Sequence, residues 1–279
     1  MSEFWIQHRY SESGFYIDPH FEHRYQGIVV LKGRVNYHVG EQSYLLTPGD
    51  MIVLNTLENH TLEVLEYPYE RYIFQIAPAF FQHELQFPEI ISIFVCRTPG
   101  FSHACRIPAD LWPSFCRNLQ EMDGEYQNQN TYWKLMVGCK LRQLFIPLFR
   151  ALPEAFSPVK PGANTALVFE VQNYLNQHYQ EDLSMEQLAA QFFVNKSYLS
   201  HLFKAVTGYS VKQFLIALRL NCAKALLVQT DETVSEIAGR CGYTDFAHFS
   251  RLFRKNENCS PSEFRKRSSM GQPSSNMDE

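Results

Sequence analysis

The C-terminal third of the chain contains an internal repeat, which constrains the fold more than any other feature of the sequence. Residues 184–195 (SMEQLAAQFFVN) align with residues 233–244 (TVSEIAGRCGYT) at an offset of 49. Residues 200–204 align with 250–254 at an offset of 50, so one additional residue lies near the turn of the second copy. Two copies of one sequence pattern predict two copies of one supersecondary unit.

Each copy begins with the spacing of a capping box, in which two side chains three residues apart cap each other's backbone. The residues with this spacing are Ser184, Gln187, Thr233 and Glu236. A turn and a longer helix are expected next, with Asn195 as the N-cap in the first copy and Thr244 or Asp245 in the second. Gly208 and Asn258 tolerate the left-handed conformation that ends such helices.

Both longer helices have an apolar stripe opposite a polar face. The apolar residues are Leu199, Leu202, Phe203 and Val206 in the first and Phe249, Leu252 and Phe253 in the second. A short helix, a tight turn and a longer polar-faced helix form a helix-turn-helix. Because two matching copies are present, the pattern is more specific than one amphipathic helix pair.

The segment 211–228 joins the two copies and has helical periodicity. A helix of this length measures about 27 Å, whereas successive major-groove faces on one side of B-DNA lie about 34 Å apart. A rigid connecting helix is therefore expected to hold two reading helices in adjacent grooves, with some bending of the DNA.

Charge is unevenly distributed along the chain. Residues 164–267 carry 12 basic and 10 acidic side chains, whereas residues 1–163 carry 13 and 17, and the whole chain has a net charge of −4. This balance argues against nucleic-acid binding by bulk charge. The basic excess is concentrated in 251–267, within and after the second repeat.

The N-terminal part is expected to be a sandwich or barrel of short strands, reaching to about residue 81. Gly33 is expected to end one strand at a turn, and Val35, Tyr37 and Val39 alternate with polar residues in the next. Residues 82–155 are expected to be helical, with two amphipathic helices between 110 and 152, the second ended or kinked by Pro147. The predicted fold class is α+β with two domains. The predicted boundaries are a sheet and dimerisation domain over 1–155, a linker over 156–163, an all-α domain over 164–267 and a disordered tail over 268–279.

Several classes of protein are excluded by what the sequence lacks. No apolar run approaches the roughly 18 residues that span a bilayer, and the first ten residues do not resemble a signal peptide. The seven cysteines form no C-x-x-C pair, so neither disulfides nor a thiolate zinc site is expected. The predicted location is the cytoplasm. No phosphate loop, catalytic triad or zinc motif is present, so neither an enzyme nor a cofactor is predicted.

Residues 164–267 resemble the DNA-binding domain of AraC-family transcriptional regulators. The resemblance runs through 183–189, 198–204, 208, 219, 223, 226–227, 237–238, 241–246, 248–254, 260–261 and 264–265. Two positions depart from the family. Asn258 replaces the usual Gly, and Glu257 stands where an apolar residue is common, so Glu257 is expected to loosen the end of its helix.

This resemblance implies that the helices beginning near Asn195 and Thr244 enter successive major grooves. The implied DNA-contacting residues are Asn195, Lys196, Ser197, Ser200, His201, Lys204, Asp245, Phe246, Ala247, His248, Arg251, Arg254 and Lys255. Arg251 is the best candidate for a bidentate contact with guanine. Lys204, Arg254 and Lys255 suit phosphate contacts, which position a protein without specifying a sequence. Ser197 and Ser200 are short, so weak direct readout is expected from the first helix.

The N-terminal region is similar to the cupin-type sensor domain of the same family. His20, Glu22, Gln26 and His60 stand at positions where a metal-binding cupin carries its ligands, and two of the four have changed type, so no metal is expected. The expected effector-binding residues are His20, Glu22, Tyr37, His38 and His60. The resemblance implies a transcriptional regulator, more commonly an activator, that binds double-stranded DNA and responds to a small molecule such as a sugar. It also implies a homodimer formed through the helices between 110 and 152, with RNA polymerase as a further partner.

Two alternatives remain open on the sequence. The first is a metal-dependent cupin enzyme that uses His20, Glu22 and His60 as ligands and carries an appended helical module. The second is a repeat domain that binds protein and no longer contacts DNA.

Overall fold

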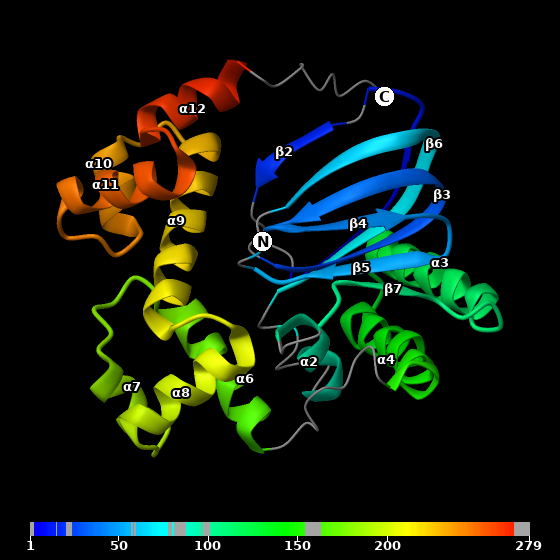
Figure 1. Ribbon diagram of the computed structural model, residues 1–279, viewed down its shortest axis with the longest axis horizontal. Coiled ribbons are helices and arrows are strands. Elements are labelled where there is room, and N and C mark those ends of the chain that lie inside the picture. Colours follow the sequence, from blue (N-terminus) through cyan, green and yellow to red (C-terminus); the bar gives the residue numbers. More distant parts are fainter. Residues whose placement is uncertain are drawn as a thin grey trace.

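The computed structural model describes residues 3–14, 16–20, 24–56, 58, 60–77, 80, 88–95, 97, 101–153 and 163–270. An antiparallel sheet with helices on one side forms the N-terminal part, and a group of helices forms the C-terminal part (Figure 1). The predicted α+β class with two structural parts is confirmed. None of the helices in the described ranges is long and apolar enough to cross a membrane.

The sheet is antiparallel throughout, with strands in the order β1-β6-β3-β5-β7, β2 paired with β6 and β4 paired with β3. The strands are β1 (Phe4–Ser11), β2 (Tyr16–His20), β3 (Tyr25–Val39), β4 (Gln42–Leu46), β5 (Asp50–Leu54), β6 (His60–Ile76) and β7 (Ala104–Arg106). Val35, Tyr37 and Val39 are buried and their neighbours are not, because successive side chains of a strand point to opposite faces.

Gly33 does not end a strand, as the sequence suggested, but lies inside the single long strand β3. Its φ is +83°, and a Cβ there would lie 2.5 Å from the carbonyl oxygen of Glu66. The register between β3 and β6 shifts on both sides of this residue. Gly33 therefore forms a bulge that lets the two long strands cross closely.

Three helices cover one face of the sheet: α2 (Pro88–Val95), α3 (Trp112–Asn128) and α4 (Trp133–Ala151) (Figure 1). Helix α4 continues through Pro147 instead of ending there. A proline inside a helix removes one backbone hydrogen bond. The loss is tolerated here because Leu144, Phe145 and Leu148 on either side of the proline are buried.

The C-terminal part consists of α6 (Ala163–His178), α7 (Met185–Gln191), α8 (Lys196–Thr207), α9 (Val211–Gln229), α10 (Val234–Arg240), α11 (Phe246–Glu257) and α12 (Pro261–Met270). Helix α9 has 19 residues and a length of about 28 Å, as the sequence predicted. The pair α7–α8 and the pair α10–α11 lie at opposite ends of it (Figure 1).

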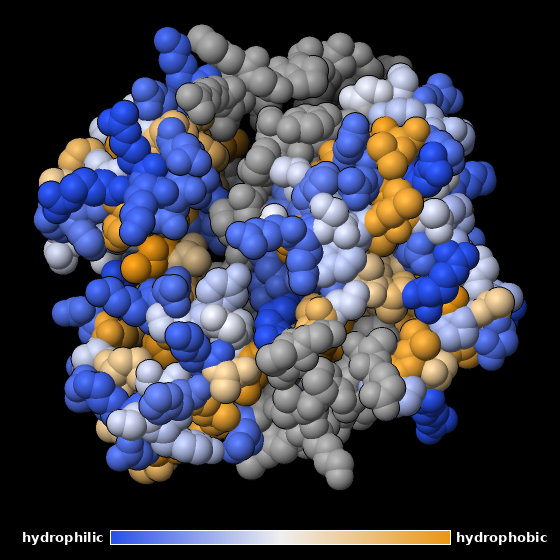
Figure 2. Space-filling model, viewed as in Figure 1, coloured by the Kyte–Doolittle hydropathy of each residue, from blue (hydrophilic) through white to orange (hydrophobic). Residues whose placement is uncertain are grey.

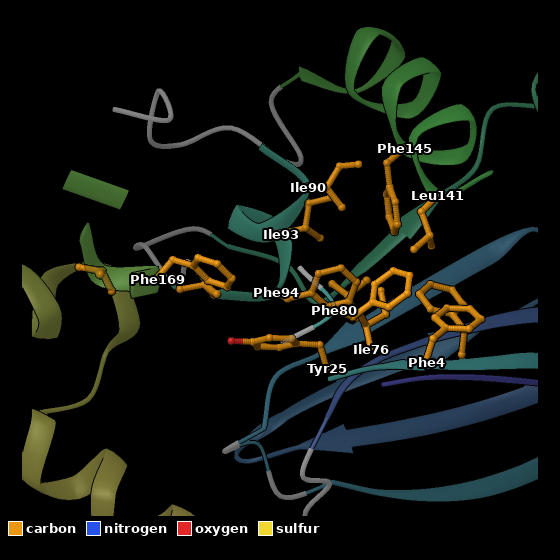
Figure 3. Close-up of a cluster of buried hydrophobic side chains, with 14 of the residues drawn as sticks. Phe4, Tyr25, Ile76, Phe80, Ile90, Ile93, Phe94, Leu141, Phe145 and Phe169 are labelled. Carbon is orange, nitrogen blue, oxygen red and sulfur yellow. The ribbon is translucent and has the colours of Figure 1, made fainter. Parts of the chain in front are cut away.

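The apolar core does not divide at the boundary between the two parts. One cluster extends from Phe4 and Phe94 of the sheet domain to Phe169, Phe203 and Phe214 of the helical part. Figure 3 shows this cluster from the sheet across α2 and α4 to Phe169. The α10–α11 pair has a separate core with the second half of α9. The first repeat unit is therefore packed into the sheet domain, and the second has its own core.

The predicted linker and the predicted tail lie only partly within the described residues. The linker lies outside the described residues except for Ala163, which begins α6. Helix α12 runs to Met270, so residues 268–270 are helical instead of disordered; residues 271–279 lie outside the described range. The six described cysteines are free thiols.

Candidate nucleic-acid interface

Both capping boxes form as the sequence predicted. The Ser184 hydroxyl accepts a hydrogen bond from the Gln187 amide at 3.2 Å, and the Gln187 side chain accepts one from the Ser184 amide at 2.9 Å. Thr233 and Glu236 repeat the arrangement at 3.3 and 2.8 Å. These contacts fix where the first helix of each unit begins.

The second helix of each unit is capped by a short polar side chain. Asn195 Oδ1 accepts hydrogen bonds from the amides of Ser197 and Tyr198 at 2.8 and 3.4 Å, at the start of α8. Asp245, and not Thr244, caps α11. These caps satisfy backbone donors that would otherwise be unpaired. Gly208 and Asn258, with φ of +77° and +55°, follow the two helices as expected.

Every residue implied to contact DNA is exposed. The exposed set comprises Asn195, Lys196, Ser197, Ser200, His201 and Lys204 in the first unit and Asp245, Phe246, Ala247, His248, Arg251, Arg254 and Lys255 in the second. The opposite sides of α8 and α11 are buried through Leu199, Phe203, Phe249 and Phe253. Both helices thus present a solvent-facing polar surface, and no described part of the chain covers it.

The basic residues of α11 are available to an anionic partner. Among the described residues, Arg251, Arg254 and Lys255 form no ion pair. Lys196, at the start of α8, does pair with the exposed Glu186, and it must leave that partner to reach a phosphate. Hydrogen bonds from the amides of His248 and Ala247 lower the pKa of Asp245, with a smaller contribution from Arg251, so Asp245 caps α11 as a carboxylate.

Glu257 does not loosen the end of α11, contrary to expectation. Its Oε1 lies 3.0 Å from Lys224 Nζ, and both side chains are about one-tenth exposed. Burial lowers the pKa of Lys224, and the carboxylate of Glu257 partly offsets that effect. The departure from the family pattern is therefore compensated by an ion pair between α9 and α11.

Arg219 of α9 connects the segment between α6 and α7 with the second repeat unit. Its Nε donates to the carbonyl of Tyr179 at 2.6 Å and its Nη2 to the carbonyl of Glu181 at 2.7 Å, while the guanidinium lies 5.5 Å from the ring centre of Tyr243. A cleft of about 720 Å³ lies beside it, bounded by α7, α9 and the start of α11. In Figure 2 apolar surface shows between the two lobes at the left. Sequence reasoning did not identify this connection.

The structure brings together only part of the expected effector site. Tyr37 and His60 are buried, with ring centres 6.5 Å apart. His38 lies on the other face of β3 and bonds to Ser43 at 2.8 Å. Strand β2 pairs His20 with His60 in register, but the His20 side chain and all of Glu22 lie outside the described residues. The effector site stays a prediction.

Glu22, one of the three ligands in the metal alternative, also lies outside the described residues. Among the side chains that are described, no group of three or more His, Cys, Asp or Glu residues is arranged to hold a metal ion.

A buried ionic network lies where the sheet domain meets α8. Glu58 Oε2 accepts a hydrogen bond from Arg97 Nη2 at 2.8 Å, and Glu58 Oε1 contacts Arg97 Nε and, at 2.8 Å, His103 Nε2. The Arg97 amide donates to the carbonyl of Val206 in α8 at 2.9 Å. Burial alone would raise the pKa of Glu58, but Arg97 and His103 outweigh it and lower that pKa to about 2.

Two further contacts join the same surfaces. Asn221 Nδ2 of α9 donates to the carbonyl of Thr56 at 3.1 Å, and Tyr25 Oη donates to Gln172 Oε1 of α6 at 3.5 Å. Sequence reasoning missed the whole network, because each of these contacts joins residues that are 39 or more positions apart and no local spacing relates them.

A sheet domain ahead of paired helix-turn-helix units is the architecture of ligand-responsive helix-turn-helix proteins. Residues 5–112 match the model of an AraC-like ligand binding domain, and residues 188–267 match that of a helix-turn-helix domain. The chain is thus similar to AraC-type regulators in both of its parts, as its sequence resemblance indicated.

Known proteins resemble the chain in two ways. It is 37% identical over 111 residues to the HTH-type transcriptional regulator YijO of Escherichia coli strain K12, covering 39% of each chain. It is 34% identical over 122 residues to the activator RhaS of Klebsiella pneumoniae strain 342, covering 44% of each. The chain thus aligns with about two fifths of these relatives. Over 94% of both chains it shares the fold of ToxT from Vibrio cholerae strain SCE256, crystallised with an unsaturated fatty acid, at 14% identity and a TM-score of 0.59.

Proposed function

We propose that this chain is a sequence-specific DNA-binding transcriptional regulator whose binding is controlled by a small molecule. The observation that carries the proposal is the pair of capped helices, α8 and α11, whose polar faces are exposed and whose units are joined by the 19-residue helix α9. A spacing of about 28 Å suits two adjacent major grooves on a bent duplex.

Arg251 is proposed to read a base, and Arg254 and Lys255 to contact phosphates. A bidentate contact to guanine contributes about 1–3 kcal/mol of discrimination. Arg251→Ala should therefore reduce the preference for the specific site over random DNA by about 5- to 150-fold. Arg254→Ala should weaken both kinds of binding alike.

The test is a titration of labelled duplexes by fluorescence anisotropy, using a site selected from random sequences by the wild-type chain. Lys212→Ala is the matched control, because Lys212 is an exposed cation on α9 and not on either reading helix. An Arg251→Ala variant that keeps the wild-type preference would refute the assigned role. If the wild-type chain selects no sequence at all, the proposed function is wrong.

The effector is proposed to bind inside the sheet domain, near Tyr37 and His60. The fatty acid bound in the ToxT crystal structure supports the idea that this fold holds a small organic molecule. His60 Nδ1 lies 3.2 Å from the carbonyl of Glu58, whose carboxylate binds Arg97, which in turn contacts α8. A ligand that moves His60 would act on the first reading helix through this chain of contacts.

A homodimer formed through the helices on the sheet is proposed as the form that binds DNA. Leu135 and Met136 of α4 are 51% and 44% exposed, and an apolar helix surface of this kind suits a subunit contact. Two linked DNA-binding domains gain affinity through effective concentration. Leu135→Glu should convert a dimer to a monomer in sedimentation velocity, and a wild-type chain that sediments as a monomer would refute this part.

Activation of transcription through RNA polymerase, in the cytoplasm, completes the proposal. The name of the relative RhaS as an activator supports the sign of regulation. In vitro transcription from a promoter that contains the selected site tests it, and a fall in transcript on adding the chain would reverse the sign.

A further inference from the structure

Phe193 is the most exposed large apolar side chain among the described residues, with 97% of its surface accessible. It lies in the turn between α7 and α8, and its φ of +54° is in the left-handed region. This conformation is disfavoured for residues with a Cβ and is a genuine outlier for a bulky residue. The residue is therefore both exposed to water and placed in an unfavourable backbone conformation.

The second repeat unit shows what the turn itself requires. The residue equivalent to Phe193 at the offset of 49 is Gly242, which has a φ of +82°. A Cβ at Gly242 would lie 2.6 Å from the carbonyl oxygen of Gln180, so glycine is needed there. The same turn at position 193 would accept glycine or asparagine without strain, and folding gives no reason for phenylalanine.

The backbone at Phe193 is fixed beside the start of α8. The amide of Phe193 donates to the carbonyl of Ala190 at 3.1 Å, and that of Val194 donates to the carbonyl of Ala189 at 3.0 Å. Asn195, two residues further on, caps α8. The turn is thus closed by backbone hydrogen bonds, and Phe193 lies next to the helix end that is proposed to enter the major groove.

We propose that Phe193 is a further DNA-contacting residue, which lays its ring against an apolar part of the duplex, a thymine methyl group or a deoxyribose, at the edge of the site read by α8. The inference rests on the proposed function. The start of α8 attracts phosphate through its helix dipole and the neighbouring Lys196, which brings the duplex to the ring. Apolar contact with thymine methyl groups is an established mode of readout, and it supplements the short side chains of Ser197 and Ser200.

The test separates DNA binding from folding. Phe193→Gly and Phe193→Asn relieve the backbone, so both variants should resist urea at least as well as the wild-type chain. Their affinity for the selected duplex should fall by about fivefold or more, whereas Phe193→Tyr should keep it. Tyr10→Ser serves as the control, because Tyr10 is also an exposed aromatic residue (53%) but lies on β1.

Replacing each thymine of the duplex by deoxyuridine removes one methyl group at a time. If one deoxyuridine substitution weakens binding of the wild-type chain but not of Phe193→Gly, the ring contacts that thymine methyl group. If Phe193→Gly binds more weakly but no thymine is sensitive to the substitution, the ring contacts a deoxyribose. Unchanged DNA affinity of Phe193→Gly overturns the inference. If transcription falls while the DNA affinity stays unchanged, the ring contacts a protein partner and the inference is still overturned. Loss of stability in both the Gly and the Asn variants also overturns it. A wild-type chain that selects no sequence refutes the proposed function instead.

Discussion

Replacing Glu58 with Gln should destabilise the folded chain by about 3–5 kcal/mol at neutral pH, as expected when one partner of a buried ion pair is removed. The Glu58 carboxylate is 7% exposed and the Arg97 side chain 9%. Gln keeps one acceptor oxygen but places an amide donor where the second oxygen meets the guanidinium. The substitution therefore removes the negative charge that both guanidinium nitrogens, Nε and Nη2, contact.

The pH dependence gives an independent value for the same contribution. The pKa of Glu58 is lowered from 4.5 to about 2 in the folded chain, which by linkage corresponds to about 3 kcal/mol. Because the folded pKa is the lower one, this stabilisation is fully present above pH 4.5. It is lost progressively as the pH falls from 4.5 through 2.

Urea unfolding followed by tryptophan fluorescence measures the change in the free energy of unfolding of the domain that contains Glu58. All three tryptophans, Trp5, Trp112 and Trp133, lie in this N-terminal part. The difference between wild type and Glu58→Gln should shrink by about half or more between pH 7 and pH 3. Glu66→Gln is the control, since Glu66 is 57% exposed and pairs with the exposed Arg34. A Glu58→Gln effect below about 1 kcal/mol, or one that is equal at both pH values, would refute the reasoning.

Three further predictions follow from local contacts. Ser184→Ala and Thr233→Ala should each lower the free energy of unfolding by about 1 kcal/mol in urea titrations, because each removes a capping hydrogen bond; no change would show that solvent replaces the cap. Gly242→Ala should destabilise the second unit by about 2 kcal/mol or more in hydrogen exchange, whereas Gly124→Ala, in an open helical position, should be neutral or stabilising. DNA affinity should fall steeply with salt, and Arg254→Ala should reduce the slope of log affinity against log salt by about one; an unchanged slope would remove Arg254 from the phosphate contacts.

The features that could be predicted from the sequence depend on neighbours a few residues apart. Helix starts and ends follow from the side-chain chemistry of one residue and its position relative to the helix. The examples are the N-caps Ser184, Asn195 and Asp245 and the left-handed residues Gly208 and Asn258 that end α8 and α11. The repeat unit could be recognised because the same local pattern occurs twice. Exposure of the reading surfaces follows from the same periodicity.

The features that could not be predicted depend on contacts between distant segments. Gly33 was expected to form a turn, because only the pairing of β3 with β6 reveals that it is a bulge. Glu257 was expected to weaken α11, because Lys224 lies on another helix. The Glu58–Arg97 pair depends on how the sheet packs against the helical part, and no local spacing in the sequence predicts that packing.

The continuity of the apolar core has a consequence for engineering hybrid regulators. A cut between residues 153 and 163 would divide a single core. A foreign DNA-binding domain would have to pack an apolar surface against Phe94 and supply an acceptor for the Arg97 amide in place of the carbonyl of Val206. Helices α10 to α12 have their own core with the end of α9. Transplanting only these helices leaves the interface between the sheet domain and the first unit unchanged. The second helix-turn-helix unit, with its proposed DNA contacts, is therefore the part of this protein that can be exchanged with the least disturbance to the sheet domain.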